Sequence, residues 1–168
     1  MVESALFREG MSWLGSAVNI ITTDGAAGRH GFTASAVCSV TDTPPTLLVC
    51  MNRTVSSHEA FLQNKVLCVN VLRGDHKTLA NGFASRRLSM DDRFGQAEWT
   101  RLKTQAPALV GATVNFDCII DKVTSVGTHD VLFCTVQAVR LADNREGLIW
   151  LGRSYHELQD PSAFGSQI

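Results

Sequence analysis

The feature that most constrains the fold is a series of short apolar runs separated by turn residues. Many of their residues are β-branched, and most of the runs are too short for a helix of ordinary length. Turn residues at Asp24–Gly28 and Gly127–Asp130 are typical of hairpins. The sequence therefore predicts a chain that is mainly β. The expected strands are Ala17–Thr23, Gly31–Val40, Thr46–Met51, Val66–Leu72, Ala112–Val126, Val131–Leu141 and Gly147–Leu151.

A few segments have helical spacing instead. Glu3–Leu14 has the pattern of one amphipathic helix, and polar Gly74–Arg93 predicts one or two short helices. Ser56 and Ser57 can offer an N-cap hydroxyl to a further short helix. Strands at both ends with short helices between them predict a closed or partly split β-barrel with helical insertions.

Two segments are expected to lack regular structure. Trp99–Pro107 is predicted to be a loop. The tail Gln159–Ile168 contains Pro, Gly and Ser and is predicted to be poorly ordered.

Length and charge limit the kinds of partner. The 168 residues fit one domain, and 15 Lys and Arg stand against 16 Asp and Glu without a block of like charge. We therefore expect no nucleic acid and no membrane as partners, and instead a small molecule or a protein. The amino terminus lacks the pattern of a signal peptide, so we expect a cytoplasmic protein.

The five cysteines lie far apart in apolar runs and form no C-x-x-C pair. Free cysteine behaves as a small buried hydrophobe, so the sequence predicts reduced thiols in the core. These residues are Cys38, Cys50, Cys68, Cys118 and Cys134.

Several familiar site motifs are missing from the sequence. It contains neither G-x-G-x-x-G after a strand nor a P-loop, so a nucleotide would not bind in a Rossmann crevice or on a P-loop. It also lacks an H-x-x-x-H pair and a G-x-S-x-G elbow, which argues against most metallohydrolases and acyl transferases.

Thr33–Ser39 stands out because nearly all its side chains are small, with hydroxyls on Thr33, Ser35 and Ser39. Small side chains let a flat ligand reach the backbone, and a flavin ring needs donors near its carbonyls and N5. On composition alone, a strand packed closely against a helix is the simpler interpretation.

A series of motifs in this order resembles the flavin reductase family of the FMN-binding split barrel, including the reductase component of 4-hydroxyphenylacetate 3-monooxygenase and related two-component monooxygenases. The resemblance extends from Phe7 to Glu157 and is specific because several separate motifs agree. It implies a flavin reductase domain at 1–158 and a tail at 159–168. The motifs are Gly31–Val40, Asp42–Pro45, Leu47–Arg53, Ser56–His58, Leu67–Leu72, Arg93–Phe94, Gly127–His129 and Gly152–His156.

The family implies a homodimer of split barrels with flavin near the subunit interface. Its members transfer a hydride from NADH or NADPH to FMN or FAD, and the reduced flavin leaves for a partner oxygenase. Direct transfer between stacked rings needs no acid or base, because positioning supplies most of the rate.

The resemblance also implies a flavin site. One group of residues would line the ring, a second would hold the ribityl and phosphate end, and Phe83 would lie beside the flavin. A loop with one Arg, several hydroxyls and a helix start suits an anion. Alternatively, Ser56 or Ser57 is a simple N-cap, Arg53 a solvated charge and Phe83 a core residue. The ring residues are Thr33, Ala34, Ser35, Ala36 and Val37, with Ser39 beyond them; the phosphate residues are Asn52, Arg53, Thr54, Ser56 and Ser57.

For the nicotinamide nucleotide, the resemblance implies His129, Gly152, Arg153 and Tyr155. His129 would be the catalytic residue, first by positioning and second as a proton donor. An exposed loop histidine and a tyrosine at the barrel rim are the simpler alternatives. Trp150 stands where relatives often have Tyr or Phe. Two other functions stay open: a non-enzymatic flavin- or haem-binding split barrel, and an oxidase like the pyridoxamine phosphate family.

Overall fold

The computed structural model of the chain describes residues 1–143 and 145–164. Its centre is a seven-stranded antiparallel sheet in the order β3-β2-β6-β9-β10-β5-β4. The strands are β2 Asn19–Thr23, β3 His30–Ala34, β4 Val37–Asp42, β5 Pro45–Asn52, β6 Val66–Val71, β9 Val114–Val126 and β10 His129–Leu141. The prediction of a mainly β chain is confirmed, as is the hairpin of β9 and β10.

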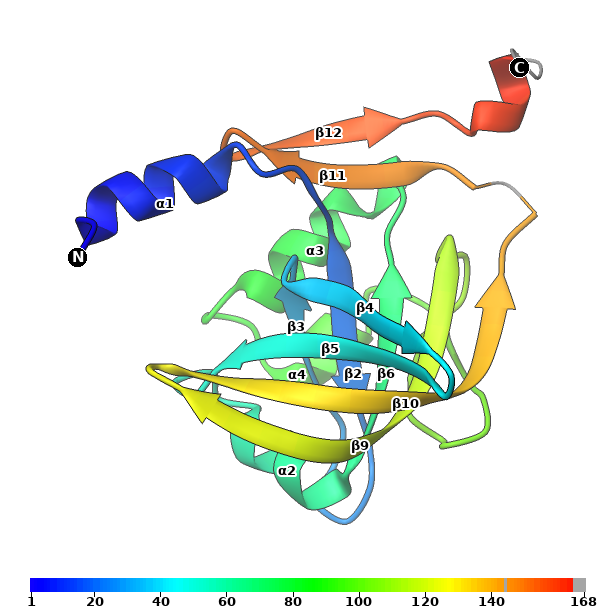
Figure 1. Ribbon diagram of the computed structural model, residues 1–168. Helices are drawn as coiled ribbons and strands as arrows, with labels where there is room; N and C mark the ends of the chain where they lie inside the picture. Colours follow the sequence, from blue (N-terminus) through cyan, green and yellow to red (C-terminus); the bar gives the residue numbers. More distant parts are fainter. Residues whose placement is uncertain (144, 165–168) are drawn as a thin grey trace.

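The sheet curls on itself into a barrel (Figure 1). One core cluster contains Ile21 and Phe32 from one edge of the sheet, and Val49 and Met51 from near the other. Both edges therefore bury their apolar side chains in the same interior, as a barrel requires.

The predicted strand Gly31–Val40 is wrong as a single strand. The chain leaves β3 at one edge of the sheet, crosses through Ser35 and Ala36, and enters β4 at the other edge. This crossing bridges the seam of the barrel. We call this run, Thr33–Val37, the seam segment; Ser35 and Ala36 are exposed in it.

Short helices lie beside the barrel, except for the N-terminal helix, which projects away from it (Figure 1). They are α1 Ser4–Ser12, α2 His58–Asn64, α3 Lys77–Ala84 and α4 Met90–Phe94, with 3-10 turns η1 Gly74–His76 and η2 Pro161–Phe164. The helices expected at both Glu3–Leu14 and Gly74–Arg93 are confirmed.

A second apolar cluster joins α3 and α4 to the outside of β2. Ile20 and Leu79 are buried there, and the Phe83 ring meets that of Phe94 edge-on at 5.1 Å between centroids. Burial of this kind stabilises by roughly 1.5–3 kcal/mol for each large side chain. It fixes the end of α3 and the start of α4 beside the barrel, which positions the site described below.

Two further small sheets flank the barrel. Strand β1 Ser16–Ala17 pairs with β11 Gly147–Leu151, which pairs with β12 Ser154–Leu158. The predicted loop at Trp99–Pro107 is wrong: β7 Trp99–Arg101 and β8 Pro107–Leu109 pair as a small antiparallel sheet. These strands are too short to show a period, and Pro107 stands at a strand start, where proline is tolerated.

The prediction of buried thiols holds for Cys68, Cys118 and Cys134 but is wrong for Cys38. Cys38 lies on β4, an edge strand whose side chains are mostly exposed. Cys50 is half-buried, and all five thiols are free.

Within the predicted tail, residues 159 and 160 have no regular structure, η2 follows, and residues 165–168 lie outside the described part of the chain. Across residues 1–143 and 145–164, no helix is long and apolar enough to cross a membrane.

Candidate functional site

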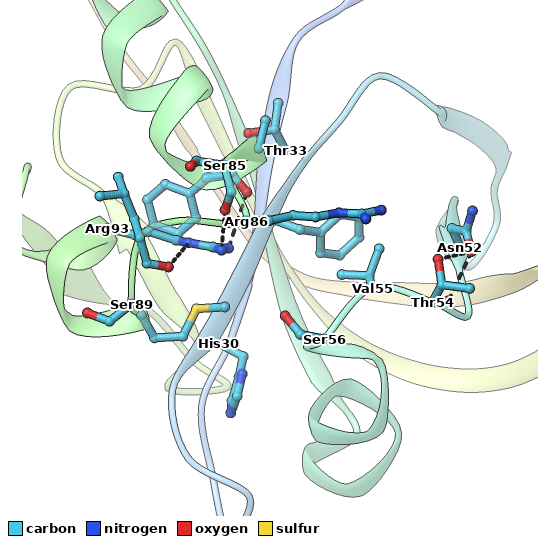
Figure 2. A pocket seen from close by; sticks show the side chains of 15 residues that line it. His30, Thr33, Asn52, Thr54, Val55, Ser56, Ser85, Arg86, Ser89 and Arg93 are labelled. Atoms are coloured by element: carbon cyan, nitrogen blue, oxygen red, sulfur yellow. Dashed lines mark hydrogen bonds between the residues drawn. The ribbon is translucent and has the colours of Figure 1, made fainter.

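A pocket of about 670 Å³ opens beside the barrel, between β3, the loop after β5 and the segment joining α3 to α4 (Figure 2). This size is typical of small-molecule sites. It is lined by His30, Phe32, Thr33, Asn52, Thr54, Val55, Ser56, Phe83, Ala84, Ser85, Arg86, Leu88, Ser89, Met90 and Arg93.

The pocket is cationic. Two arginines and a histidine line it, and none of the described lining residues is Asp or Glu. The Nδ1 atom of His30 is buried without a hydrogen-bond partner in the described chain. A buried polar atom without a partner is costly, so this nitrogen is available to a ligand. The arrangement suits an anionic ligand.

Arg93 supplies a buried charge. Its side chain is buried, and its guanidinium donates to four backbone carbonyls, those of Gly31, Phe83, Ser85 and Leu88. Burial lowers the pKa of Arg93, but a guanidinium stays charged at neutral pH. No ion pair of Arg93 with a carboxylate is found in residues 1–143 and 145–164. The wall of the pocket therefore holds a positive charge that protein dipoles, rather than an acid, stabilise.

Loop 52–57 forms the opposite wall. The Asn52 carboxamide oxygen accepts hydrogen bonds from both the amide and the hydroxyl of Thr54, each at 2.9 Å. Ser56 lines the pocket, whereas the Ser57 hydroxyl is buried and points to the carbonyl of Gly31 at 3.5 Å. Ser57, the residue before α2, makes no capping hydrogen bond with its side chain.

Arg53 points away from the pocket. Its amide donates to the Thr128 carbonyl at 3.1 Å, and its guanidinium donates to the carbonyl of Gly127. Asn52, Thr54 and Ser56 of the predicted phosphate residues therefore line the pocket, and Arg53 and Ser57 do not.

A second, buried connection ties the same loop to the β9–β10 hairpin. His58, at the start of α2, lies with Nε2 2.7 Å from Oδ2 of Asp130. The other oxygen of Asp130 accepts a hydrogen bond from the Ser125 hydroxyl at 2.6 Å. The hydroxyl of Ser125 and the hydrogen bond to His58 hold the pKa of Asp130 below its usual range. We refer to His58, Asp130 and Ser125 as the hairpin clamp.

The seam segment borders a smaller cavity of about 230 Å³, lined by Val18, Thr33, Ala34, Ser35, Ala84, Trp150 and Tyr155. Thr33 lines both cavities and donates its hydroxyl to the Ala80 carbonyl at 2.6 Å. Ser35 and Ala36 use their carbonyls as acceptors, and neither amide makes a hydrogen bond within the described chain. Since Ser35 lines the smaller cavity, the two free amides suit the polar edge of a flat ring bound beside it.

Two other residues predicted to lie near the flavin ring, Val37 and Ser39, line neither cavity. Val37 packs on the barrel core, and Ser39 is exposed on β4. Phe83 is both a core residue and a pocket residue, because it is 1% exposed in the second core cluster and also lines the pocket.

The predicted nicotinamide residues do not line the larger pocket. His129 is exposed and begins β10, where it pairs in register with Asn52 of the pocket. Gly152 and Arg153 form the turn between β11 and β12, and Arg153 pairs with Glu9 of α1 at 2.6 Å. Tyr155 lines the smaller cavity and donates to Asn81 Oδ1 at 2.9 Å.

Sequence reasoning missed five polar lining residues. They come mostly from the segment between α3 and α4, which has no motif of its own; the family motif Arg93–Phe94 was the only signal there. The missed residues are His30, Ser85, Arg86, Ser89 and Arg93.

The curled sheet and the seam segment that crosses between its two edges define a split barrel of the FMN-binding type. A model described as the flavin reductase like domain matches residues 11–159. The chain therefore belongs to the flavin reductase family.

Similar proteins are found among both sequences and structures. The FMN reductase (NADH) RutF of Pantoea ananatis (strain LMG 20103) is 57% identical over 157 residues, 94% of this chain and 82% of the relative. The protein of the same name from Escherichia coli (strain K12) is 53% identical over 162 residues, 96% of this chain and 98% of the relative.

Among solved structures, one from Haemophilus somnus 129PT superposes with a TM-score of 0.90 at 48% identity, covering 94% of this chain and 100% of that chain. BorF, the flavin reductase component of a bacterial two-component tryptophan halogenase, gives a TM-score of 0.87 at 27% identity, covering 94% and 99%.

Proposed function

We propose that this protein is an NADH-dependent flavin reductase that supplies reduced flavin to a partner oxygenase. The observation that carries the proposal is the cationic pocket beside the seam segment, together with the free backbone amides of Ser35 and Ala36 next to the smaller cavity. The names of the relatives, FMN reductase (NADH), favour FMN and NADH over FAD and NADPH.

In this proposal the seam segment, Thr33–Val37, holds the flavin ring, and loop 52–57 holds the ribityl and phosphate end. Phe83 supports the flavin from the pocket wall, and Ser39 lies beyond the ring on β4. When bound, the flavin accepts a hydride at N5 from C4 of the nicotinamide. The protein contributes by holding the two ligands in position and by excluding water, so no general acid is needed.

For the nicotinamide nucleotide we propose His129 together with Gly152, Arg153 and Tyr155. Arg153 is engaged with Glu9 at 2.6 Å, and this ion pair lowers the pKa of Glu9. A pyrophosphate would take the place of that carboxylate, so α1 would respond to nucleotide binding.

The proposal of a partner oxygenase is supported by a similar structure that belongs to a two-component system. BorF is the flavin reductase component of a two-component halogenase. We propose that the product here, reduced flavin, likewise leaves the site for a second protein. Five free thiols suit the reducing cytoplasm.

We further propose a homodimer. Helix α1 buries none of its residues, although Leu6, Phe7 and Met11 are large and apolar. Val123 of β9 and Val139 of β10 are also exposed, at 40% and 50%. Apolar surface on several elements is typical of an interaction face.

NADH oxidation with and without added flavin tests the proposed function. We expect the protein alone to oxidise little NADH and the protein with added FMN to oxidise NADH rapidly. A flavin- or haem-binding sensor would bind its ligand without turnover. A pyridoxamine-phosphate-like oxidase would turn over its own substrate and ignore NADH, and either result would refute the proposal.

A further inference from the structure

We infer that Arg86, and not Arg53, is the cation that binds the flavin phosphate and sets a preference for FMN over riboflavin. The inference rests on the proposed function, because that function makes a flavin the ligand of the pocket. It adds a specificity-determining residue that the sequence motifs do not contain.

Arg86 lies between α3 and α4 with its side chain exposed, and it lines the larger pocket. Figure 2 shows the side chain extending across the pocket toward the loop that carries Thr54 and Val55. Within residues 1–143 and 145–164, its guanidinium has neither a hydrogen-bond acceptor nor an ion-pair partner. A planar fork of donors without a partner, facing hydroxyls across a cavity, fits a phosphate that both walls share.

The carboxylates nearest in the chain do not compete for Arg86. Asp91 pairs with Arg29 at 3.4 Å, and Asp92 accepts from the Ser89 hydroxyl at 2.6 Å. No acidic side chain lines the pocket in the described chain, and the buried charge of Arg93 adds to the positive potential. An anion entering this space therefore meets two guanidinium groups and no opposing carboxylate.

Arg53, by contrast, is already hydrogen-bonded outside the pocket. Its guanidinium donates to the carbonyl of Gly127, and its amide donates to that of Thr128. Neither bond leads into the pocket, and Arg53 is absent from the pocket wall. Arg53 therefore acts as a structural link between loop 52–57 and the β9–β10 hairpin.

The test removes the charge and the phosphate separately. Dissociation constants for FMN and for riboflavin, which lacks the phosphate, are measured by fluorescence for the wild type, Arg86→Ala, Arg86→Lys, Arg53→Ala and Arg87→Ala. Arg87 is the matched control, because it is an exposed neighbouring arginine that does not line the pocket. Melting temperatures show whether each variant is folded.

In the wild type, FMN should bind more tightly than riboflavin, and added salt should weaken the binding of FMN but not that of riboflavin. Arg86→Ala should reduce that preference by roughly tenfold to a hundredfold through its effect on FMN, since a charge-assisted hydrogen bond is lost. Arg86→Lys should keep part of the preference, and Arg87→Ala all of it. Arg53→Ala should change the dissociation constants of FMN and riboflavin by the same factor.

Three results would overturn the inference: no preference for FMN in the wild type, an unchanged preference in Arg86→Ala, or a loss of preference in Arg53→Ala. A wild type that binds FMN with the expected preference but does not oxidise NADH would instead refute the proposed function, so the two failures are distinguishable.

Discussion

His129 differs from two other histidines of the chain because no carboxylate holds it. His58 is bonded to Asp130 and His76 lies beside Asp75, whereas the ring of His129 meets only the Thr128 hydroxyl, at 2.9 Å, in the described chain. Its ring is exposed at the end of a hairpin and adjacent in register to the pocket residue Asn52. Such a histidine is free to contact a second ligand.

We predict that His129→Ala raises the KM for NADH and leaves the flavin affinity and the melting temperature nearly unchanged. Loss of one hydrogen bond to the nucleotide costs about 1 kcal/mol, or several-fold in kcat/KM. Steady-state kinetics measure the change. His156→Ala, which removes another exposed histidine, is the control. Wild-type NADH kinetics in His129→Ala would leave Arg153 and Tyr155 as the nicotinamide residues.

Most of the site residues that the sequence identified belong to matched motifs, and most of those it missed do not. Thr33, Asn52 and Ser56 belong to matched motifs, Thr54 lies between two of them, and all four line the pocket. Arg93 was missed although it belongs to a matched motif. Arg86 could not be identified, because a solvated arginine and a pocket arginine look alike in a polar segment. The direction in which Arg53 points depends on the partner carbonyl of Gly127, 74 residues away in the chain.

The hairpin of β9 and β10 is linked at two points to loop 52–57 and the start of α2 that follows it, and the hairpin clamp is the buried one of the two. The Asp130 side chain is 5% exposed and accepts from both neighbouring side chains. The hydroxyl of Ser125 and the hydrogen bond to His58 lower the pKa of Asp130. Its carboxylate therefore stabilises the fold above the unfolded-state pKa, about 3.9, and this contribution is lost as pH falls through the lower folded pKa.

We predict that Asp130→Asn is less stable than the wild type at neutral pH. The difference should shrink as the pH falls below about 4, where the unfolded wild type becomes protonated, and should be lost below the lower pKa of the folded state. Urea unfolding from neutral to acid pH measures the difference. Glu59→Gln removes the exposed carboxylate on the other side of His58 and should stay within about 0.5 kcal/mol. A difference that is constant with pH would contradict the assignment.

The elements themselves were predictable where a period or a turn motif was present. Long strands such as β9 and β10 showed both. The break at Ser35 and Ala36 could not be seen, because crossing the seam is a property of the closed barrel and leaves the local pattern unchanged. Strand β12 was missed because its side chains are mostly exposed, so it lacks the alternation of a half-buried strand.

The whole molecule leaves apolar side chains uncovered on α1 and on the outer side of the barrel. Phe7 is 60% exposed, and Trp13, which lies against Gly152, is 66% exposed. Since α1 also carries Glu9, the partner of Arg153, a surface that fixes α1 would affect the proposed nucleotide site.

We predict a dimer at micromolar concentration that Phe7→Asp or Val139→Asp weakens, because each places a charge on an apolar contact surface. Sedimentation velocity measures the change. Lys103→Asp, on the β7–β8 connection, alters charge at an exposed polar position and is the control. A wild-type protein that is monomeric and active throughout this concentration range would contradict the proposed dimer.

If this barrel brings NADH and flavin together, hydride should pass from one to the other on the protein. The decisive experiment is an anaerobic titration of FMN with NADH in the presence of a small amount of the protein. We expect each NADH to bleach one FMN, because one hydride carries the two electrons that flavin accepts. Bleaching no faster than in a protein-free solution, although FMN is bound, would contradict it.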